Sequence, residues 1–140
     1  MEIDKNRLAQ RFMEAIPHAQ ALGILFENIG SGTAEMYMHY DKKFVGDPQT
    51  GVIHGGVVFA LLDSCCGAAV LSHPEQKGST ATIDLRVDYM RPATPGQTIR
   101  ARAHCYNMTR SVAFVSAVAL DDNDDKPVAT AAGAFVTGKS

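Results

Sequence analysis

The chain lacks the features that mark several classes of protein. Its three cysteines, Cys65, Cys66 and Cys105, include no C-x-x-C pair and no set of paired spacings. Neither a structural zinc site nor a disulfide framework is therefore expected. The formal net charge of -2 argues against the clustered basic surface that nucleic-acid binding requires. We expect no metal and no nucleic-acid partner, and we interpret the cysteines as small buried residues in a reducing compartment.

Long unbroken apolar segments are also absent. The longest apolar stretch, residues 52–71, is interrupted by His54, by three glycines and by Asp63, which makes it a poor membrane span. The N-terminal sequence MEIDK does not combine a basic segment with a following apolar one, so no secretory signal is predicted. From both absences we expect a cytoplasmic protein without a membrane partner.

The 140 residues are enough for one domain with its own core, and no repeat or linker divides them. A single domain over residues 1–140 is therefore predicted. Turn signals and hydrophobic patterning predict six strands. These strands cover residues 24–29, 33–39, 80–90, 98–106, 111–120 and 126–137. A short first helix is predicted, with Asp4 as its cap, an apolar stripe of Leu8, Phe12, Ala15 and Ile16, and Pro17 at its end.

A long helix is predicted over residues 55–71, between the second and third strands. It is apolar on all sides and Asp63 is its one charged residue, so most of its surface must be buried. Residues 40–53, rich in Gly, Pro, Asp and Lys, are predicted to form a loop. Two strands, a buried helix and four further strands indicate an α+β fold, in which one antiparallel sheet curves around a central helix.

In the strand predicted after the long helix, apolar and polar residues alternate. Ile83, Leu85, Val87 and Tyr89 are expected on one face, and Thr82, Asp84, Arg86 and Asp88 on the other. The alternation is typical of a half-buried strand.

A glycine pair begins the long helix, directly after His54. The first amides of a helix have no internal partner and, with the helix dipole, stabilise negative charge. Without side chains at Gly55 and Gly56, a ligand carbonyl could approach these N–H groups closely, as in an oxyanion hole. Alternatively, the glycines serve only to let the helix pack tightly against the sheet.

Asp63 is a candidate base or nucleophile, because a carboxylate in an apolar helix is desolvated unless it is paired or protonated. The alternative is that it caps a neighbouring element or pairs with an arginine. Asp63 follows Gly56 by seven residues, about 10 Å along a helix. One chain cannot easily bring both to the same reacting group. Two antiparallel copies of the helix could, which predicts a homo-oligomer with shared sites.

The segment GVIHGGV (residues 51–57), together with Asp63 and with DLRVDYMRPA (residues 84–93), resembles the hotdog-fold acyl-CoA thioesterases of the PaaI type. The resemblance implies a hotdog fold, an acyl-CoA substrate, active sites at a dimer interface and no cofactor beyond the substrate's own CoA. It implies that Asp63 activates water or attacks the thioester, and that the Gly56 amide polarises the carbonyl with Gly55 nearby. By the same resemblance, His54 shapes the loop before the helix and Thr82 assists the attacking water.

One position departs from the family. An asparagine often precedes the motif histidine by six residues and contacts the thioester, whereas this chain has Pro48 there. Gln49 could substitute as a polar contact. Arg91 and Arg110 lie where the family tends to bind the CoA phosphates, but each could equally be a solvated loop charge. The assembly could be a dimer or a dimer of dimers.

Two other functions fit the same motifs. A hotdog hydratase or dehydratase would use a histidine with a carboxylate to move water across an enoyl thioester, but His54 beside the glycine pair suits loop shaping better. A non-catalytic acyl-CoA-binding protein would leave Asp63 without a use. The acyl group is not specified by the sequence, although a pocket lined by Phe59, Leu62, Cys66 and Met90 would take a medium chain or an aryl ring.

Overall fold

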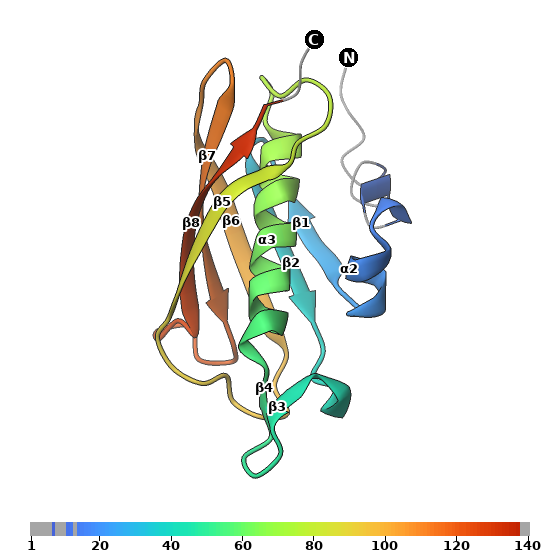
Figure 1. Cartoon of the computed structure of the whole chain (residues 1–140), viewed down its shortest axis with the longest axis vertical. Coiled ribbons are helices and arrows are strands. Elements are labelled where there is room, and N and C mark those ends of the chain that lie inside the picture. Colours follow the sequence, from blue (N-terminus) through green and yellow to red (C-terminus); the bar gives the residue numbers. More distant parts are fainter. Residues whose placement is uncertain (1–6, 8–10, 13, 138–140) are drawn as a thin grey trace.

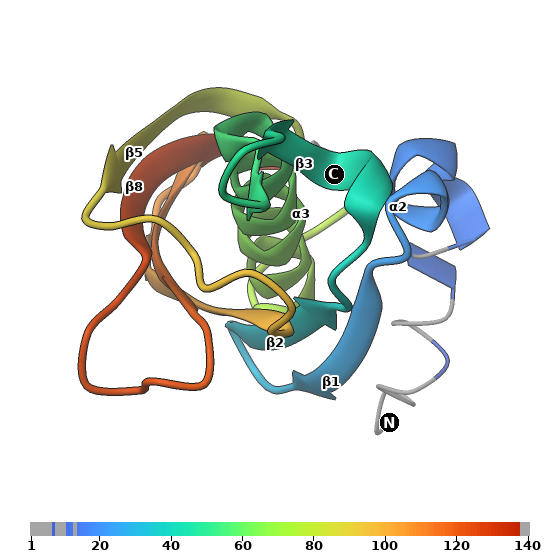
Figure 2. The same ribbon diagram turned by 90° about the horizontal axis from the view of Figure 1, so that it is seen from below.

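The computed structural model describes residues 7, 11, 12 and 14–137. A six-stranded antiparallel sheet curves around one long helix, α3 (Gly55–Ser72), as Figures 1 and 2 show from two sides. This is the α+β architecture that the sequence predicts, and the fold prediction is confirmed.

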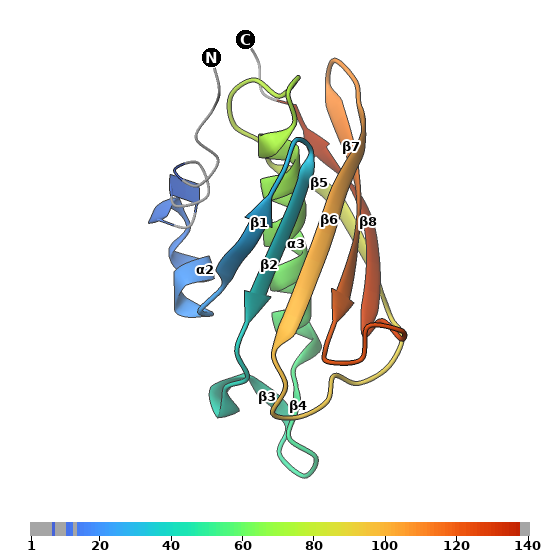
Figure 3. The same ribbon diagram turned by 180° about the vertical axis from the view of Figure 1, so that it is seen from behind.

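The sheet combines the first two strands of the chain with the four that follow α3 (Figure 3). The strands are β1 (Leu25–Ile29), β2 (Thr33–Met38), β5 (Thr82–Tyr89), β6 (Ile99–Met108), β7 (Val112–Leu120) and β8 (Ala129–Val136). Their order across the sheet is β1-β2-β6-β7-β8-β5, with antiparallel neighbours throughout. β5 is therefore an edge strand, and β7, apolar on both faces in the sequence, is an interior strand.

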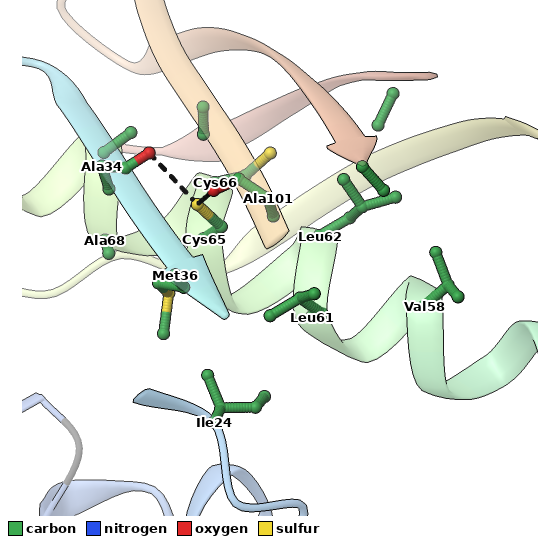
Figure 4. Packing of buried hydrophobic residues seen from close by; sticks show 14 of the residues in the cluster. Ile24, Ala34, Met36, Val58, Leu61, Leu62, Cys65, Cys66, Ala68 and Ala101 are labelled. Atoms are coloured by element: carbon green, nitrogen blue, oxygen red, sulfur yellow. Dashed lines mark hydrogen bonds between the residues drawn. The ribbon is translucent and has the colours of Figure 1, made fainter. Parts of the chain in front are cut away.

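The core lies between α3 and the sheet. Nine helix residues are buried, namely Val58, Leu61, Leu62, Cys65, Cys66, Gly67, Ala68, Ala69 and Val70. They pack against inward-facing strand residues such as Met36 and Ala101 (Figure 4). By length and composition α3 could also cross a membrane, but this is weak evidence because the core helix of a soluble protein passes the same test. Burial of the helix against its own sheet accounts for about half of this apolar span, since 50% of it is buried within the chain.

The N-terminal region differs from its prediction at Pro17. Residues 7, 11, 12, 14 and 15 are helical, Ile16 is extended, and Pro17 then begins a second short helix, α2 (Pro17–Ala21). Proline fits the first position of a helix because its missing N–H would have no partner there. Pro17 thus starts a helix as well as ending one. The predicted cap Asp4 and the stripe residue Leu8 lie outside the described residues.

The prediction of a loop over residues 40–53 is partly wrong. A 3-10 turn, η1 (Lys42–Phe44), leads into a two-stranded hairpin of β3 (Val45–Asp47) and β4 (Val52–Ile53). Its turn is closed by the Asp47 carboxylate, which accepts hydrogen bonds from the Gln49 amide and the Thr50 hydroxyl. The strands are two and three residues long, too short to show a period of two in the sequence. The hairpin lies beyond the N-terminal end of α3 (Figure 1).

A bulge in β5 changes the face on which Thr82 lies. Thr82 pairs with Phe135 and Asp84 with Ala134, so Ile83 is an extra residue without a partner on β8. Simple alternation places Thr82 on the face of Asp84, away from the helix. The extra residue instead turns Thr82 to the inner face, and β-bulges commonly re-aim a side chain in this way.

Candidate active site

Asp63 and Thr82 form the first half of the candidate site. The Thr82 hydroxyl donates a hydrogen bond of 2.7 Å to Oδ1 of Asp63, from the start of β5 to the middle of α3. Among the described residues no arginine or lysine pairs with Asp63. In the single chain Asp63 is half-buried rather than enclosed, and its carboxylate is directed toward the edge strand β5. The carboxylate is thus oriented by one hydroxyl and keeps Oδ2 for another group.

The second half of the site is the start of α3. His54 is the N-cap residue, with extended backbone angles, and its Nδ1 accepts a hydrogen bond of 2.8 Å from the Gly56 N–H. A Cβ on Gly56 would lie 2.9 Å from that nitrogen, so only glycine lets the imidazole approach this amide without displacement. The Gly56 amide, predicted to polarise a carbonyl, is therefore occupied by His54 in the structure.

Tyr89 is a site residue that the sequence analysis did not single out. It lies at the end of β5, and its hydroxyl donates a hydrogen bond of 2.7 Å to the Gly55 carbonyl. Its ring atoms lie 3.4 Å from the position of a Cβ on Gly55, so the ring packs over that glycine. Alternation along β5 places Tyr89 on the same face as Leu85 and Val87, and that is the signal which could have identified it.

The structure does not place Arg91 for phosphate binding. Its guanidinium forms a two-pronged ion pair with Asp121, at 2.7 Å to each carboxylate oxygen. The remaining N–H groups donate to the backbone carbonyls of Pro92 and Lys126. Asp121 is fully buried and also accepts from Thr94. All five guanidinium donors are used, so Arg91 holds two loops together and offers none to a ligand.

The other two predicted contacts lie at opposite ends of the molecule. Gln49 is exposed in the turn of the β3–β4 hairpin, and among the described residues its side chain has no hydrogen-bond partner. Arg110 is exposed between β6 and β7, where its backbone carbonyl accepts a hydrogen bond from Thr137. Both side chains are free to meet a ligand, and neither contacts Asp63 or His54 in this chain.

The cysteines do not compete with Asp63 as nucleophiles. All three are free and buried. Burial, and then the nearby charge of Asp63, raises the pKa of the Cys66 thiol to about 12. Burial also raises the pKa of Cys65 and of Cys105. The thiols therefore stay protonated near neutral pH, whereas nucleophilic attack requires the thiolate. Among the described residues, no group of three His, Cys, Asp or Glu side chains could hold a metal ion.

Several apolar side chains of α3 and of the β5 region are exposed in the single chain. Phe59, on the uncovered side of α3, is 38% exposed, and on β5 and just after it Ile83, Tyr89 and Met90 are 52–59% exposed. The predicted acyl pocket combined Phe59 and Met90 with Leu62 and Cys66. The last two are completely buried in the core and cannot line an open surface, because they face the sheet.

Comparisons with known proteins agree with this architecture. A family model described as "Thioesterase superfamily" matches residues 50–128, more than half of the chain. A medium/long-chain acyl-CoA thioesterase, YigI, of Salmonella typhimurium is 27% identical over 94% of this chain and 92% of its own length. A crystal structure of a Pseudomonas aeruginosa protein is 33% identical, with a TM-score of 0.85 over 96% of this chain and 99% of that one. The Escherichia coli PaaI protein, from a phenylacetic acid degradation operon, has the same fold, with a TM-score of 0.85. It is 21% identical, and the match covers 97% of this chain and 94% of that one.

Proposed function

This chain belongs to the thioesterase superfamily, and we propose that it hydrolyses an acyl-CoA thioester to the free acid and CoA, with Asp63 as the reacting carboxylate. The observation that carries the proposal is the Thr82–Asp63 hydrogen bond at 2.7 Å, beside an uncovered apolar surface. The hydroxyl orients a carboxylate that no cation among the described residues neutralises. Such a carboxylate can accept a proton from water or attack a carbonyl carbon itself.

The reaction requires a donor for the carbonyl oxygen, and we assign this role to the Gly56 amide at the start of α3. Its position about 10 Å along the helix from Asp63 supports a site shared between two copies of the chain. The exposed apolar side chains of α3 and β5 support the same arrangement, since a second copy would bury them. A dimer is thus the smallest active unit, and a dimer of dimers would contain the same sites.

In this mechanism, Asp63 takes a proton from water while the hydroxide oxygen attacks the thioester carbon. The displaced electron pair moves onto the carbonyl oxygen, which the Gly56 N–H stabilises. The pair then returns, the carbon–sulfur bond breaks, and the CoA thiolate takes the proton from Asp63. Direct attack by a carboxylate oxygen of Asp63 would instead form an anhydride as the carbon–sulfur bond breaks and CoA leaves as the thiolate. Water then hydrolyses the anhydride to the free acid and the Asp63 carboxylate, and its remaining proton goes to the thiolate. In both routes the hydrogen bond from the Gly56 N–H to Nδ1 of His54 must break, so that this N–H can donate to the carbonyl oxygen instead.

Substrate binding outside the reacting atoms is assigned by position. Arg110 remains the proposed contact for the CoA phosphates, and Gln49 a proposed polar contact to the thioester. The relative named a medium/long-chain acyl-CoA thioesterase supports including such chains in a substrate screen. The free cysteines support the proposed cytoplasmic location, where thiols stay reduced.

The test of the reaction is thiol release from short-, medium-, long-chain and aryl acyl-CoAs by the wild type and by Asp63→Asn. We expect Asp63→Asn to reduce kcat by about a thousandfold or more, with fold and assembly unchanged. Full activity in Asp63→Asn would remove the mechanism. Hydration of an enoyl-CoA without thiol release would support the hydratase, and acyl-CoA binding without turnover would support a binding protein.

The shared site is tested by mixing two inactive variants. Gly56→Pro removes the proposed donor and displaces the His54 imidazole from it, at a position in the first helical turn where the helix backbone tolerates proline. Co-expressed with Asp63→Asn, it forms mixed dimers in which one site of two keeps both Gly56 and Asp63. Random pairing should restore about a quarter of the wild-type activity. If each site lay within one chain, the mixture would stay inactive.

A further inference from the structure

Tyr89 and His54 hold opposite ends of one peptide group. The Gly55 carbonyl and the Gly56 N–H belong to the same planar amide. Tyr89 donates to its oxygen at 2.7 Å, and Nδ1 of His54 accepts from its nitrogen at 2.8 Å. The Tyr89 ring also lies 3.4 Å from the position that a Cβ of residue 55 would take, so it packs against this residue. The orientation of the proposed carbonyl donor is therefore determined from outside the helix.

Such a contact has two physical consequences. Glycine has more backbone freedom than other residues, so a glycine pair needs an external contact to keep one orientation. Hydrogen bonds in a chain also polarise one another, so a phenol on the carbonyl oxygen strengthens the N–H of the same amide as a donor. Burial raises the pKa of Tyr89, so its hydroxyl keeps its proton at neutral pH.

We propose that Tyr89 is a positioning residue, which aims and polarises the Gly56 N–H toward the thioester carbonyl. The inference rests on the proposed function, because it concerns the donor of that reaction. In this role Tyr89 acts through the Gly55–Gly56 peptide rather than on the reacting atoms. When the imidazole of His54 gives way to the substrate, the Tyr89 hydroxyl is the contact that keeps this peptide in place.

The location of Tyr89 gives β5 two roles. At its first residue the strand presents Thr82 to Asp63, and at its last residue it presents Tyr89 to Gly55. Seven residues of strand span about 23 Å, so the two contacts lie in different halves of the site. In a shared-site dimer, each β5 would thus orient the carboxylate of one active site and the amide donor of the other.

The test is Tyr89→Phe, which keeps the ring on Gly55 and removes the hydroxyl alone. We expect kcat to fall about tenfold, with KM changed less than about twofold, because the lost interaction strengthens in the transition state. Tyr106→Phe is the matched control: Tyr106 is an exposed tyrosine of β6 without a hydrogen bond among the described residues, and its loss should leave kcat unchanged.

A spectroscopic measurement separates positioning from a general structural role. In an Asp63→Asn background, which binds without turnover, the C=O stretch of a bound aryl thioester reports how strongly the donor polarises it. Adding Tyr89→Phe should reduce the shift of that band to lower frequency. An unchanged band and unchanged kcat would overturn the proposal, as would a kcat loss explained by dissociation in size-exclusion chromatography. Failure of the reaction mechanism is a separate outcome, since it would appear as activity in Asp63→Asn alone.

Discussion

The Oγ1 atom of Thr82 lies 2.7 Å from Oδ1 of Asp63, although the two residues belong to different elements and Thr82 should by alternation face away from the helix. The contact exists because Ile83 is bulged out of the β5–β8 ladder. An unpartnered residue in an edge strand thus determines which group orients the candidate catalytic carboxylate. Three tests follow from this contact, from the bulge and from the buried ion pair at Asp121.

Thr82→Val removes the hydroxyl and keeps the shape of the side chain. A hydrogen bond to a charged group is worth about 1.5–3 kcal/mol, so loss of the Asp63 orientation should lower kcat by about tenfold or more. Thr82→Ser keeps the donor and should retain most of the activity. Steady-state kinetics of both variants with one acyl-CoA provide the measurement. Wild-type kcat in Thr82→Val would show that Asp63 does not depend on this hydroxyl.

Gly133→Ala tests the strand contact next to the bulge. Gly133 pairs with Leu85, and a Cβ there would lie 2.9 Å from Leu85 Cδ1 and closer still to the carbonyl oxygen of Asp84. The Asp84 carbonyl is part of the strand backbone and cannot move away as a flexible side chain could. We therefore expect the free energy of unfolding to fall by about 2 kcal/mol, as is typical of overpacking. Displacement of β5 should also lower kcat through Thr82.

The matched control for this substitution is Gly67→Ala in α3. A Cβ at position 67 would be 3.8 Å from the Phe135 ring, which is ordinary van der Waals contact. Alanine also has a higher helix propensity than glycine, so this variant should be as stable as the wild type or more so. Equal denaturation midpoints for the two variants would contradict the proposed clash at Gly133.

Asp121 gives the protein a defined sensitivity to acid. Hydrogen bonds from Arg91 hold the pKa of the Asp121 carboxyl far below its ordinary value. Because the pKa is lower in the folded state, the stabilisation is complete above the unfolded pKa of about 3.9 and is lost as the pH falls below it. Asp121→Asn should lower the free energy of unfolding by about 3 kcal/mol at pH 7, and the difference from wild type should shrink below about pH 4.

Urea denaturation at several pH values measures this effect. Asp124→Asn is the control, since the Asp124 carboxylate is exposed and pairs with Arg100 at the surface. Its substitution should change the free energy of unfolding by less than about 1 kcal/mol at any of these pH values. A pH-independent difference between Asp121→Asn and the wild type would show that the Asp121 charge does not stabilise the fold.

Residue pattern alone was enough to predict the six strands of the main sheet, the buried helix between the second and third of them, and the residues proposed for the candidate site. These features depend on local periodicity and on the cost of burying polar groups, both of which are written along the chain. Asp63 stood out because it is the one charge in an apolar helix, and the His54-Gly55-Gly56 segment because of its place before that helix. The β3–β4 hairpin was missed because strands of two or three residues have no period to detect.

Only the tertiary structure decided which residues contact the site residues and the predicted ligand-binding residues. Arg91 pairs with Asp121, 30 residues away, and Tyr89 reaches Gly55 across 34 residues of chain. The inward turn of Thr82 depends on a register shift between β5 and β8. Such contacts are set by how strands pair and how elements pack, and neither is encoded in the spacing of a single segment. The sequence therefore determined which groups could react, while the fold decided which of them face one another.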